Sequence, residues 1–410
     1  MFLTKKENID YLVVFFVIYL SSSFVGISLN GSLNIILTIL IVVLYCLMNI
    51  NKIKMNYMNV ILFLFIITST LMTHLLNNDT TYNYLIFWVY LLCAFLVTIT
   101  LDLKRFIKVY TDIIIFIALF SLVSFLILIL TPSLLNIFPY YTNSSGIQVH
   151  NLFFSVVRNS EYFNSNYGLF WEPGAYQTFL NITLFFLLFY FEKTSKFKLF
   201  IVLLTILTTV STTGYIASGL LILIYMLTKI PIKGNGKSRN IKFILCTMLL
   251  ISMISFNKMP EVVKFKLFGK LAAITDPSLL NQTSYESTLA RTNSISVPID
   301  SFLENPFFGA GFEKLINSAE VSGSLFLTAT PLNWLGLFGL GIGITFLYLS
   351  WKWTIIFSSS YIVRFISLFF ILTIMFSENY NRNTFILMFL LFGIKITEIR
   401  GDNVVSSSDK

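Results

Sequence analysis

Charged side chains are scarce in this chain of 410 residues: they make up 11% of it, whereas soluble domains carry about 25%. Hydrophobic residues make up 56%, Phe alone occurs 43 times, and the mean hydropathy is +0.81. A water-soluble fold of this length would need charge over most of its surface. The composition therefore excludes a soluble protein and predicts an all-α polytopic membrane protein.

Cysteine and histidine are also few. Cys46, Cys93 and Cys246 all lie inside apolar runs, and none belongs to a C-x-x-C pair. His74 and His150 are far apart in the sequence, so no metal-binding set can be built around them. We expect no disulfide framework, no metal and no cofactor, and we find no nucleic-acid-binding motif.

Apolar runs predict twelve membrane-spanning helices. They cover residues 11–29, 32–50, 57–76, 84–101, 109–131, 174–191, 197–210, 213–228, 243–256, 326–349, 361–377 and 384–397. No A-x-A cleavage site follows the first run, so we expect it to be retained as a helix. The seventh, eighth and ninth runs are short for a bilayer, and one of these could be re-entrant.

The distribution of basic residues supports this count. If the N-terminus is cytoplasmic, the predicted inside segments hold 20 of the 28 Lys and Arg residues, and the short outside connections hold only Arg382. Cytoplasmic loops of membrane proteins carry this excess of positive charge. We therefore expect both termini to be cytoplasmic and the net charge of +9 to face anionic lipid.

The predicted topology divides the chain into six parts. They are a five-helix membrane segment at 1–131, an extracytoplasmic loop at 132–173, central helices at 174–256, a large extracytoplasmic loop at 257–325, three C-terminal helices at 326–397 and a cytoplasmic tail at 398–410. Long loops in compact proteins are usually functional. Helical patterns at 261–271 and 294–303 predict a small amphipathic cap, and Lys108 is the expected partner of the intramembrane Asp112.

Glu172 lies in the segment Phe170-Trp171-Glu172-Pro173-Gly174-Ala175-Tyr176, where the first long loop meets the sixth predicted span. A carboxylate followed by Pro is an ordinary helix start. The aromatic residues around the acid favour a second interpretation, in which Glu172 contacts a sugar ring beside Trp171 and Tyr176. Both interpretations stay open.

Arginines in the long loops are candidates for binding a diphosphate, because the guanidinium pairs with phosphate oxygens in a bidentate manner. These are Arg158 in the first loop and Arg291 in the second; each is also compatible with a solvated loop charge. Gly309 and Gly311 follow in the turn Asn305-Pro306-Phe307-Phe308-Gly309-Ala310-Gly311, which either exposes backbone amides to a phosphate or merely connects two elements.

Two further polar segments face outside in the predicted topology. The run Thr208 to Tyr215 is rich in hydroxyls and contains Gly214, which is typical of close helix packing. The turn Ser377 to Asn383 contains Glu378 and Arg382, which either pair with each other or, in the case of Arg382, contact substrate.

The order of these motifs along a twelve-span chain resembles the Wzy-type polymerases of the O-antigen ligase and polymerase superfamily. The resemblance covers roughly residues 150–345. It implies a multispan enzyme of the bacterial cytoplasmic membrane that transfers a glycan from undecaprenyl diphosphate to a sugar hydroxyl of another lipid-linked repeat unit. The product would be O-antigen, capsule or exopolysaccharide.

By this resemblance Glu172 and Arg291 are the catalytic residues. Arg158, Trp171, Tyr176, Gly309, Gly311 and Arg382 are then candidates for binding substrate. Arg291 would neutralise the leaving diphosphate, and Glu172 would either accept the hydroxyl proton or hydrogen-bond the sugar. No metal is needed, because the anomeric carbon is already activated.

The resemblance leaves three other functions to consider: a ligase, a flippase or other transporter, and a structural or assembly subunit of an envelope glycan complex, which would tolerate loss of Arg291 or Glu172. O-antigen ligases carry a histidine before an N-x-x-L-like segment, and residues 325–333 contain none, which favours a polymerase. A flippase or other transporter is expected to have charged residues within its spans, and here they are rare. Expected partners are lipid-linked glycans, membrane lipid, and a chain-length regulator and flippase of the same pathway.

Overall fold

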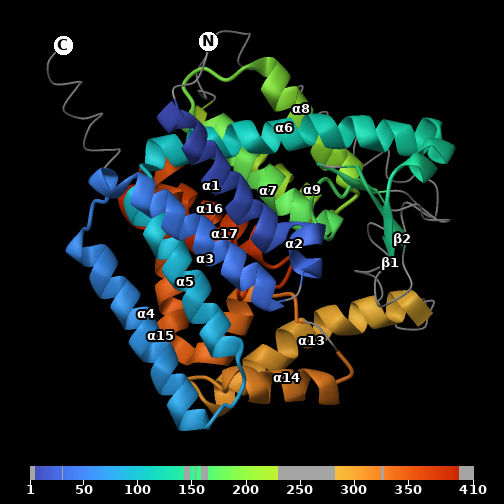
Figure 1. The fold of residues 1–410 in the computed structure, drawn as a ribbon. Coiled ribbons are helices and arrows are strands. Elements are labelled where there is room, and N and C mark those ends of the chain that lie inside the picture. The colour runs from blue at the N-terminus through green and yellow to red at the C-terminus, as the bar shows by residue number, and fades with distance from the viewer. Residues whose placement is uncertain are drawn as a thin grey trace, which may run out of the picture.

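The computed structural model describes residues 5–29, 31–142, 148–152, 154–157, 165–229, 282–324 and 327–396, and most of these are helical (Figure 1). The first part of the chain contains α1 (Lys5–Ser22), α2 (Phe24–Ser28), α3 (Gly31–Met48), α4 (Tyr57–Asn77), α5 (Asn83–Thr100) and α6 (Leu103–Leu130). The second contains α7 (Pro173–Phe185), α8 (Lys196–Thr209), α9 (Thr212–Lys229), α13 (Gln282–Glu304), α14 (Gly311–Val321), α15 (Thr330–Trp353), α16 (Tyr361–Met375) and α17 (Thr384–Phe392).

Six of the described helices are long and apolar enough to cross a bilayer. They are Gly31–Met48, Tyr57–Asn77, Asn83–Thr100, Leu103–Leu130, Thr212–Lys229 and Thr330–Ile356. The protein is therefore a predominantly α-helical, membrane-embedded protein. Every predicted span coincides with helix over most of its length except 243–256, which lies outside the described residues.

A small antiparallel sheet follows α6 in the first long loop. It has the order β1 (Tyr140–Thr142), β2 (Gln148–Asn151) and β3 (Val156–Val157), with Tyr140 opposite His150 in β2. The prediction of an all-α fold did not include this sheet. A hydrogen bond from Val156 N to Gly168 O, 2.6 Å long, ties it to the segment that leads into α7.

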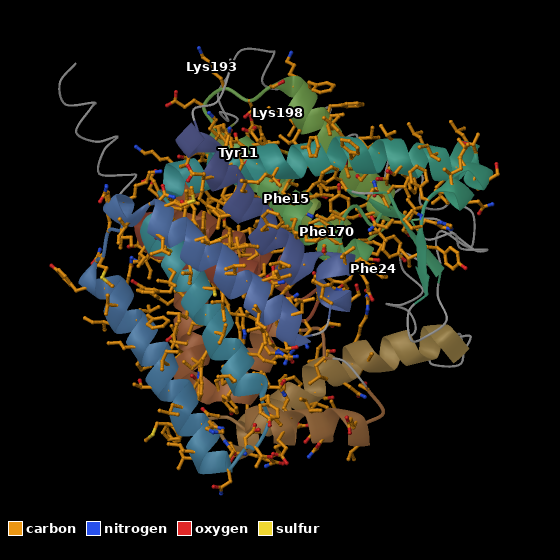
Figure 2. The ribbon with its side chains drawn as sticks, in the orientation of Figure 1. Tyr11, Phe15, Phe24, Phe170, Lys193 and Lys198 are labelled. Atoms are coloured by element: carbon orange, nitrogen blue, oxygen red, sulfur yellow. The ribbon has the colours of Figure 1, made fainter. Side chains whose placement is uncertain are left out.

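The first predicted span is interrupted at Ser23, which separates α1 from α2. The Ser23 side chain accepts a hydrogen bond from Gly26 N at 2.8 Å and so begins α2. The interrupted backbone pairs with the first long loop, because Phe24 N donates to Leu169 O at 3.1 Å and Ser23 bridges to Phe170. Figure 2 labels Phe24 and Phe170 in this region. The loop segment just before Trp171 is thereby fixed against the bundle.

Helix α15 is interrupted at Gly339, whose φ of 74° lies in the left-handed region. The turn 305–311 inserts here: Ala310 N donates to Gly336 O, and Leu340 N donates to Pro306 O, each at 2.8 Å. Irregular backbone within a membrane protein needs such partners from the protein itself. The turn after α13 therefore supplies the hydrogen-bond partners that the backbone of α15 lacks at Gly339.

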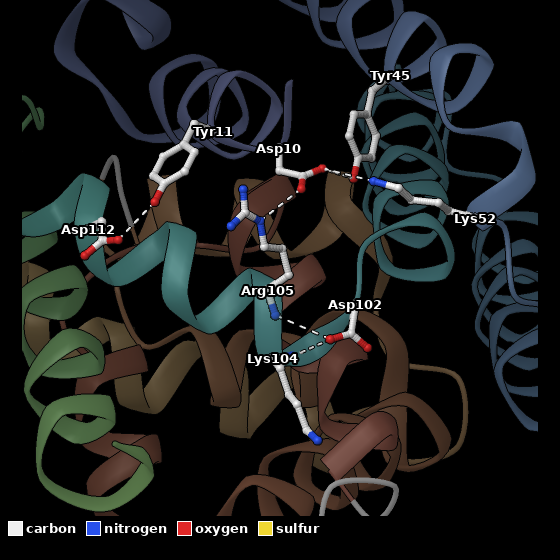
Figure 3. A network of polar contacts seen from close by, with 8 residues as sticks. All are labelled: Asp10, Tyr11, Tyr45, Lys52, Asp102, Lys104, Arg105 and Asp112. Atoms are coloured by element: carbon white, nitrogen blue, oxygen red, sulfur yellow. Dashed lines mark hydrogen bonds and ion pairs between the residues drawn. The ribbon is translucent and has the colours of Figure 1, made fainter. Parts of the chain in front are cut away.

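One end of the bundle, called here the basic end, is held by ion pairs (Figure 3). Buried Asp10 accepts hydrogen bonds from Arg105 Nε at 3.1 Å and Tyr45 Oη at 3.0 Å, and Lys52 Nζ lies 4.0 Å away. Lys395 Nζ is buried at the same end and donates to the last carbonyls of α5. Charge is tolerated here because each group has partners.

Asp112 near the basic end has partners other than the one expected. Lys198 Nζ, from α8, lies 2.8 Å from its Oδ1, and Tyr11 Oη donates to its Oδ2 at 3.0 Å. Lys198 and Lys193 point outward near the N-terminus in Figure 2. The prediction that Lys108 pairs with Asp112 missed these partners, because α1 and α8 approach α6 only in the folded protein.

The opposite end, called here the loop end, gathers the described parts of both long loops. Asn383, at the start of α17, donates to Ser21 O and Ser22 Oγ at the end of α1, both at 2.9 Å. Asp79, between α4 and α5, accepts from Glu313 N of α14 at 2.9 Å. Both loops therefore meet at one end of the bundle.

We expect the loop end to face outside and the basic end to face the cytoplasm, because positive charge is retained inside. In a variant without the native cysteines, a membrane-impermeant maleimide should label Asn317→Cys in intact cells. Ser195→Cys, which is also exposed, should react only after the membrane is opened. Lys237→Cys, outside the described residues, should behave like Ser195→Cys. Labelling of Ser195→Cys in intact cells would reverse the orientation.

Candidate functional site

Two glutamates from distant parts of the chain lie at the loop end. Glu172 immediately precedes α7, and Glu378 lies in the turn between α16 and α17. The charges of Glu172 and Arg291 both act on the Glu378 carboxyl, the first raising its pKa and the second lowering it. Glu172 and Arg291, predicted from different loops, therefore both lie within electrostatic reach of Glu378.

The turn 376–383 holds Glu378 by its backbone. Thr330 Oγ1, at the start of α15, donates to Glu378 O at 2.7 Å and accepts from Tyr380 N at 2.7 Å. Tyr380 is fully buried, and its hydroxyl donates to Thr178 Oγ1 of α7 at 3.0 Å. Helices α7, α15, α16 and α17 therefore fix Glu378 jointly.

Trp171 and Glu172 are positioned by the start of α7. Glu172 O accepts the first helical hydrogen bond, from Tyr176 N at 3.0 Å, but the Glu172 side chain makes no capping hydrogen bond. That side chain is exposed. Trp171 is half-buried and its Nε1 donates to Glu378 Oε2 at 3.4 Å. A simple helix cap therefore does not account for Glu172.

Gly174 gives Glu378 its space in the first turn of α7. A Cβ atom at this position would lie 2.2 Å from Glu378 Oε1, well inside contact distance. The carboxyl of Glu378 therefore lies directly against the N-terminal end of α7, where the helix dipole favours negative charge nearby. Only glycine leaves room for it there.

Tyr176, a candidate for binding substrate, belongs to the core. Its side chain is completely buried, its ring stacks on Phe170 at 5.1 Å, and its hydroxyl lies 2.8 Å from Ser121 Oγ of α6. These contacts fix the segment before α7, because Phe170 also pairs with Ser23. The packing of Tyr176 in the core therefore helps to fix the segment that carries Trp171 and Glu172.

Arg291 is exposed on α13, and the residues beside it hold that helix in place. Asn293 Nδ2 donates to Ser322 O at 2.7 Å and to Ser324 Oγ at 2.8 Å. Ser294 Oγ accepts from Thr328 N at 2.8 Å, two residues before Thr330. Residues 328–330 therefore contact α13 through Ser294 and the backbone of Glu378 through Thr330. Arg158, the other predicted arginine, lies outside the described residues.

Burial raises the pKa of the Glu378 carboxyl well above its usual range, and the negative charge of Glu172 raises it further. The Trp171 indole and the Arg291 guanidinium lower the pKa but do not cancel the increase. Glu378 is only 8% exposed, whereas Glu172 is exposed. The folded protein holds this proton more tightly than the unfolded chain. The stability that results is fully present below the unfolded-state pKa of Glu378 and is lost as the pH rises from that value to the raised pKa of the folded state.

The sequence allowed an ion pair between Arg382 and Glu378, but the two side chains contact other partners. An Arg382 guanidinium nitrogen donates to Asn83 Oδ1 at the start of α5, while Glu378 contacts Trp171. Arg382 is exposed at the loop end and ties this turn to α5. Glu378 itself was not among the predicted site residues, because a charge of opposite sign four positions away suggested a local ion pair.

Gly309 and Gly311 are buried and pack against backbone and side chains of other elements. Gly309 has a φ of 68°, and a Cβ there would lie 2.3 Å from the backbone of Leu337. Gly311 has a φ of 78°, and its Cβ would lie 3.0 Å from Asp79 Oδ2 and from Tyr84 Oη. Both glycines therefore allow the turn 305–311 to pack closely against other elements. This packing explains why glycine stands at both positions, and it requires no bound phosphate.

The Thr208 to Tyr215 segment packs helices closely. A Cβ at Gly214 would lie 2.8 Å from the Cβ of Gln177 in α7, and Gly214 O accepts from Asn181 Nδ2 at 3.3 Å. Gln177 and Asn181 are both fully buried and lie deeper in α7 than Glu172. The buried polar residues that follow Glu172 along α7 into the bundle, Gln177 and Asn181, are therefore uncharged.

No protein-family model matches this sequence, and no curated protein matches it significantly. The function therefore has to be argued from the geometry of the site and from the motifs of the chain.

Replacing Gly309 with Ala should destabilise the protein, because a left-handed backbone costs an L-residue about 1–2 kcal/mol and the added Cβ also meets the Leu337 backbone. Thermal unfolding of the purified protein in detergent measures the effect. Gly219→Ala in α9 is the matched control, because nothing lies within 4 Å of its Cβ position. Equal melting temperatures for the two variants would show that the turn 305–311 is not tightly inserted.

Proposed function

We propose that this protein is a Wzy-type polysaccharide polymerase of the bacterial cytoplasmic membrane. It would join undecaprenyl-diphosphate-linked repeat units by glycosyl transfer at the outer face. One observation carries the proposal: Trp171, next to Glu172, contacts the buried carboxyl of Glu378, and the charges of Glu172 and Arg291 both act on that carboxyl, at the end of the bundle where the long loops meet. A base and a cation are the two groups that this transfer requires.

The reaction follows from these groups. The acceptor hydroxyl attacks the anomeric carbon of the donor glycan, the bond from that carbon to the diphosphate breaks, and the diphosphate leaves with the electron pair. Glu172 accepts the hydroxyl proton, and Arg291 stabilises the charge that develops on the leaving group. Trp171, half-buried beside Glu378, offers an indole face to a sugar ring.

The path of the chain supports the proposed count of twelve spans. Helix α9 starts beside Gln177 near the loop end and runs away from it, whereas α13 is again at the loop end. The run 243–256 lies outside the described residues, and we propose it as the ninth span because it is apolar. Twelve spans would place both termini on the same side of the membrane.

The distribution of charge favours an enzyme over a flippase. In the described part of the chain, the buried charged residues Asp10, Asp79, Glu378 and Lys395 lie at the two ends of the bundle. The deeper polar residues of α7, Gln177 and Asn181, are uncharged. A path for a charged substrate through the bundle would be expected to carry charged residues along it.

Arg291→Ala should abolish chain elongation, and Arg291→Lys should retain only a small part of it, because an ammonium cannot reproduce the planar fork on diphosphate oxygens. The measurement is the lipid-linked and surface glycan profile of a deletion strain that expresses each variant. Lys314→Ala, an exposed cation of α14, is the matched control.

Single repeat units at the surface without long chains would identify the lost step as polymerisation. Accumulation of repeat units inside the cell would identify a flippase, and long chains that fail to reach their final acceptor would identify a ligase. Full-length polymer from Arg291→Ala, at normal protein level in the membrane, would refute the role of Arg291.

A further inference from the structure

One exposed side of α13 is apolar, whereas several of the buried side chains of this helix are polar. Ile295, Ile299 and Leu303 stand at every fourth position and are 50%, 38% and 69% exposed. Asn293 and Ser294 are buried instead and are hydrogen-bonded to the segment after α14. Residues four apart lie on one face of a helix, so the three apolar side chains form one row, called here the α13 row. In water a surface helix turns its apolar stripe to the core, so the α13 row requires an apolar environment outside the protein.

The packing of α13 on α15 keeps the α13 row on the outside. Pro298 of α13 is buried, and a Cβ atom at Gly336 of α15 would lie 2.8 Å from Pro298 O and 2.9 Å from Pro298 Cα. The two helices therefore touch at the level of their backbones. A rotation of α13 that buried Ile299 would move this contact apart and would break the hydrogen bonds of Asn293.

Two acidic residues define a second exposed side of α13. Asp300 and Glu304 are also four positions apart, and both are exposed. Glu304 Oε2 lies 2.6 Å from Lys314 Nζ of α14. The exposed surface of α13 is thus divided lengthwise into an apolar side and a charged side. Helices that lie in the surface of a membrane have this division.

The direction of α13 is also that of a helix in the membrane surface. Figure 1 shows α13 at the loop end, running crosswise to α4 and α5. Both of these helices are long and apolar enough to cross the bilayer. A helix that runs crosswise to spanning helices at one end of the bundle lies along the membrane surface.

The α13 row continues into the lipid-facing surface of the bundle. Phe307, the next residue at the same spacing, is 73% exposed. The turn that carries it is bonded to two membrane helices, because Thr73 Oγ1 of α4 donates to Phe308 O at 2.7 Å and Leu340 N of α15 donates to the same turn. Leu340 is itself exposed, as is Leu76, one helical turn beyond Thr73. Lipid covers exposed apolar residues of membrane-spanning helices, and here that surface extends to α13.

We propose that α13 is an interfacial helix, whose row of Ile295, Ile299 and Leu303 lies in the hydrocarbon of the leaflet at the loop end while Asp300 and Glu304 face water. The partner of this surface is lipid. Part of the large loop that was predicted to be extracytoplasmic therefore belongs to the membrane surface. The insertion of α13 does not depend on the proposed function.

The inserted helix would set the depth of Arg291. This residue is exposed four positions before Ile295, at the N-terminal end of the α13 row. An arginine beside lipid extends its guanidinium to the headgroup layer, where the phosphates lie. A lipid-linked diphosphate in the same leaflet has its phosphates at that depth. This consequence, unlike the insertion, rests on the proposed function.

Fluorescence quenching of the full-length protein in lipid nanodiscs tests the insertion. In the variant without native cysteines, Ile299→Cys and Asp300→Cys each carry the same NBD probe. The two positions are neighbours in the sequence but lie about 100° apart around the helix, so Asp300→Cys is the matched control. Both residues are exposed, so neither change disturbs packing. Phosphatidylcholine with a nitroxide on its acyl chain should quench the probe at Ile299→Cys at least about twofold more than the probe at Asp300→Cys.

The same probes reveal any other covering of the α13 row. Aqueous iodide should quench the probe at Asp300→Cys more than the probe at Ile299→Cys. Equal quenching of the two probes by the nitroxide lipid would overturn the inference. Protection of the Ile299→Cys probe from both quenchers would show that protein covers the row, and this result would overturn the inference as well. Loss of polymer synthesis in a strain whose α13 still inserts would leave the insertion standing.

Discussion

Peptide groups that lose their helical partners inside a membrane must find other partners in the protein, and here the two long loops supply them. The interruption at Ser23 pairs with Leu169 and Phe170, and the interruption at Gly339 pairs with the turn 305–311. The first anchor lies directly before Trp171 and Glu172, and the second closes α13, the helix that carries Arg291. These two anchors fix the segment before Glu172 and the end of α13 against the bundle.

Ionisable groups in this protein are stabilised at the two ends of the bundle by different means. At the basic end a guanidinium and a hydroxyl contact Asp10, and backbone carbonyls accept from Lys395. At the loop end the buried Glu378 carboxyl accepts from the Trp171 indole, and burial raises its pKa well above the usual range. The first arrangement holds helices together by ion pairs and hydrogen bonds, whereas the second keeps a carboxyl in a poorly solvated place.

The helices could be predicted from the sequence because apolar runs of bilayer length rarely form anything but membrane helices. The site could be predicted only in part. Glu172 and Arg291 stood out by their local motifs, but Glu378 meets Trp171 across 207 positions of the chain, and its nearest charge in the sequence, Arg382, suggested a local pair. Tyr176 lies in the core, where its ring stacks on Phe170, which the local motif did not indicate. Gly309 and Gly311 have a packing role that the sequence could not separate from phosphate binding, because both select glycine.

The insertion of the turn 305–311 into α15 limits how the large loop can vary. Ala310 N and Pro306 O are bonded to the two sides of the gap at Gly339, so this short turn belongs to the membrane bundle although it lies at the end of an external loop. A chimera that received the external loop of another protein would have to retain its own residues from Asn305 onward. The sequence can therefore vary freely only in the part of the loop that precedes this turn.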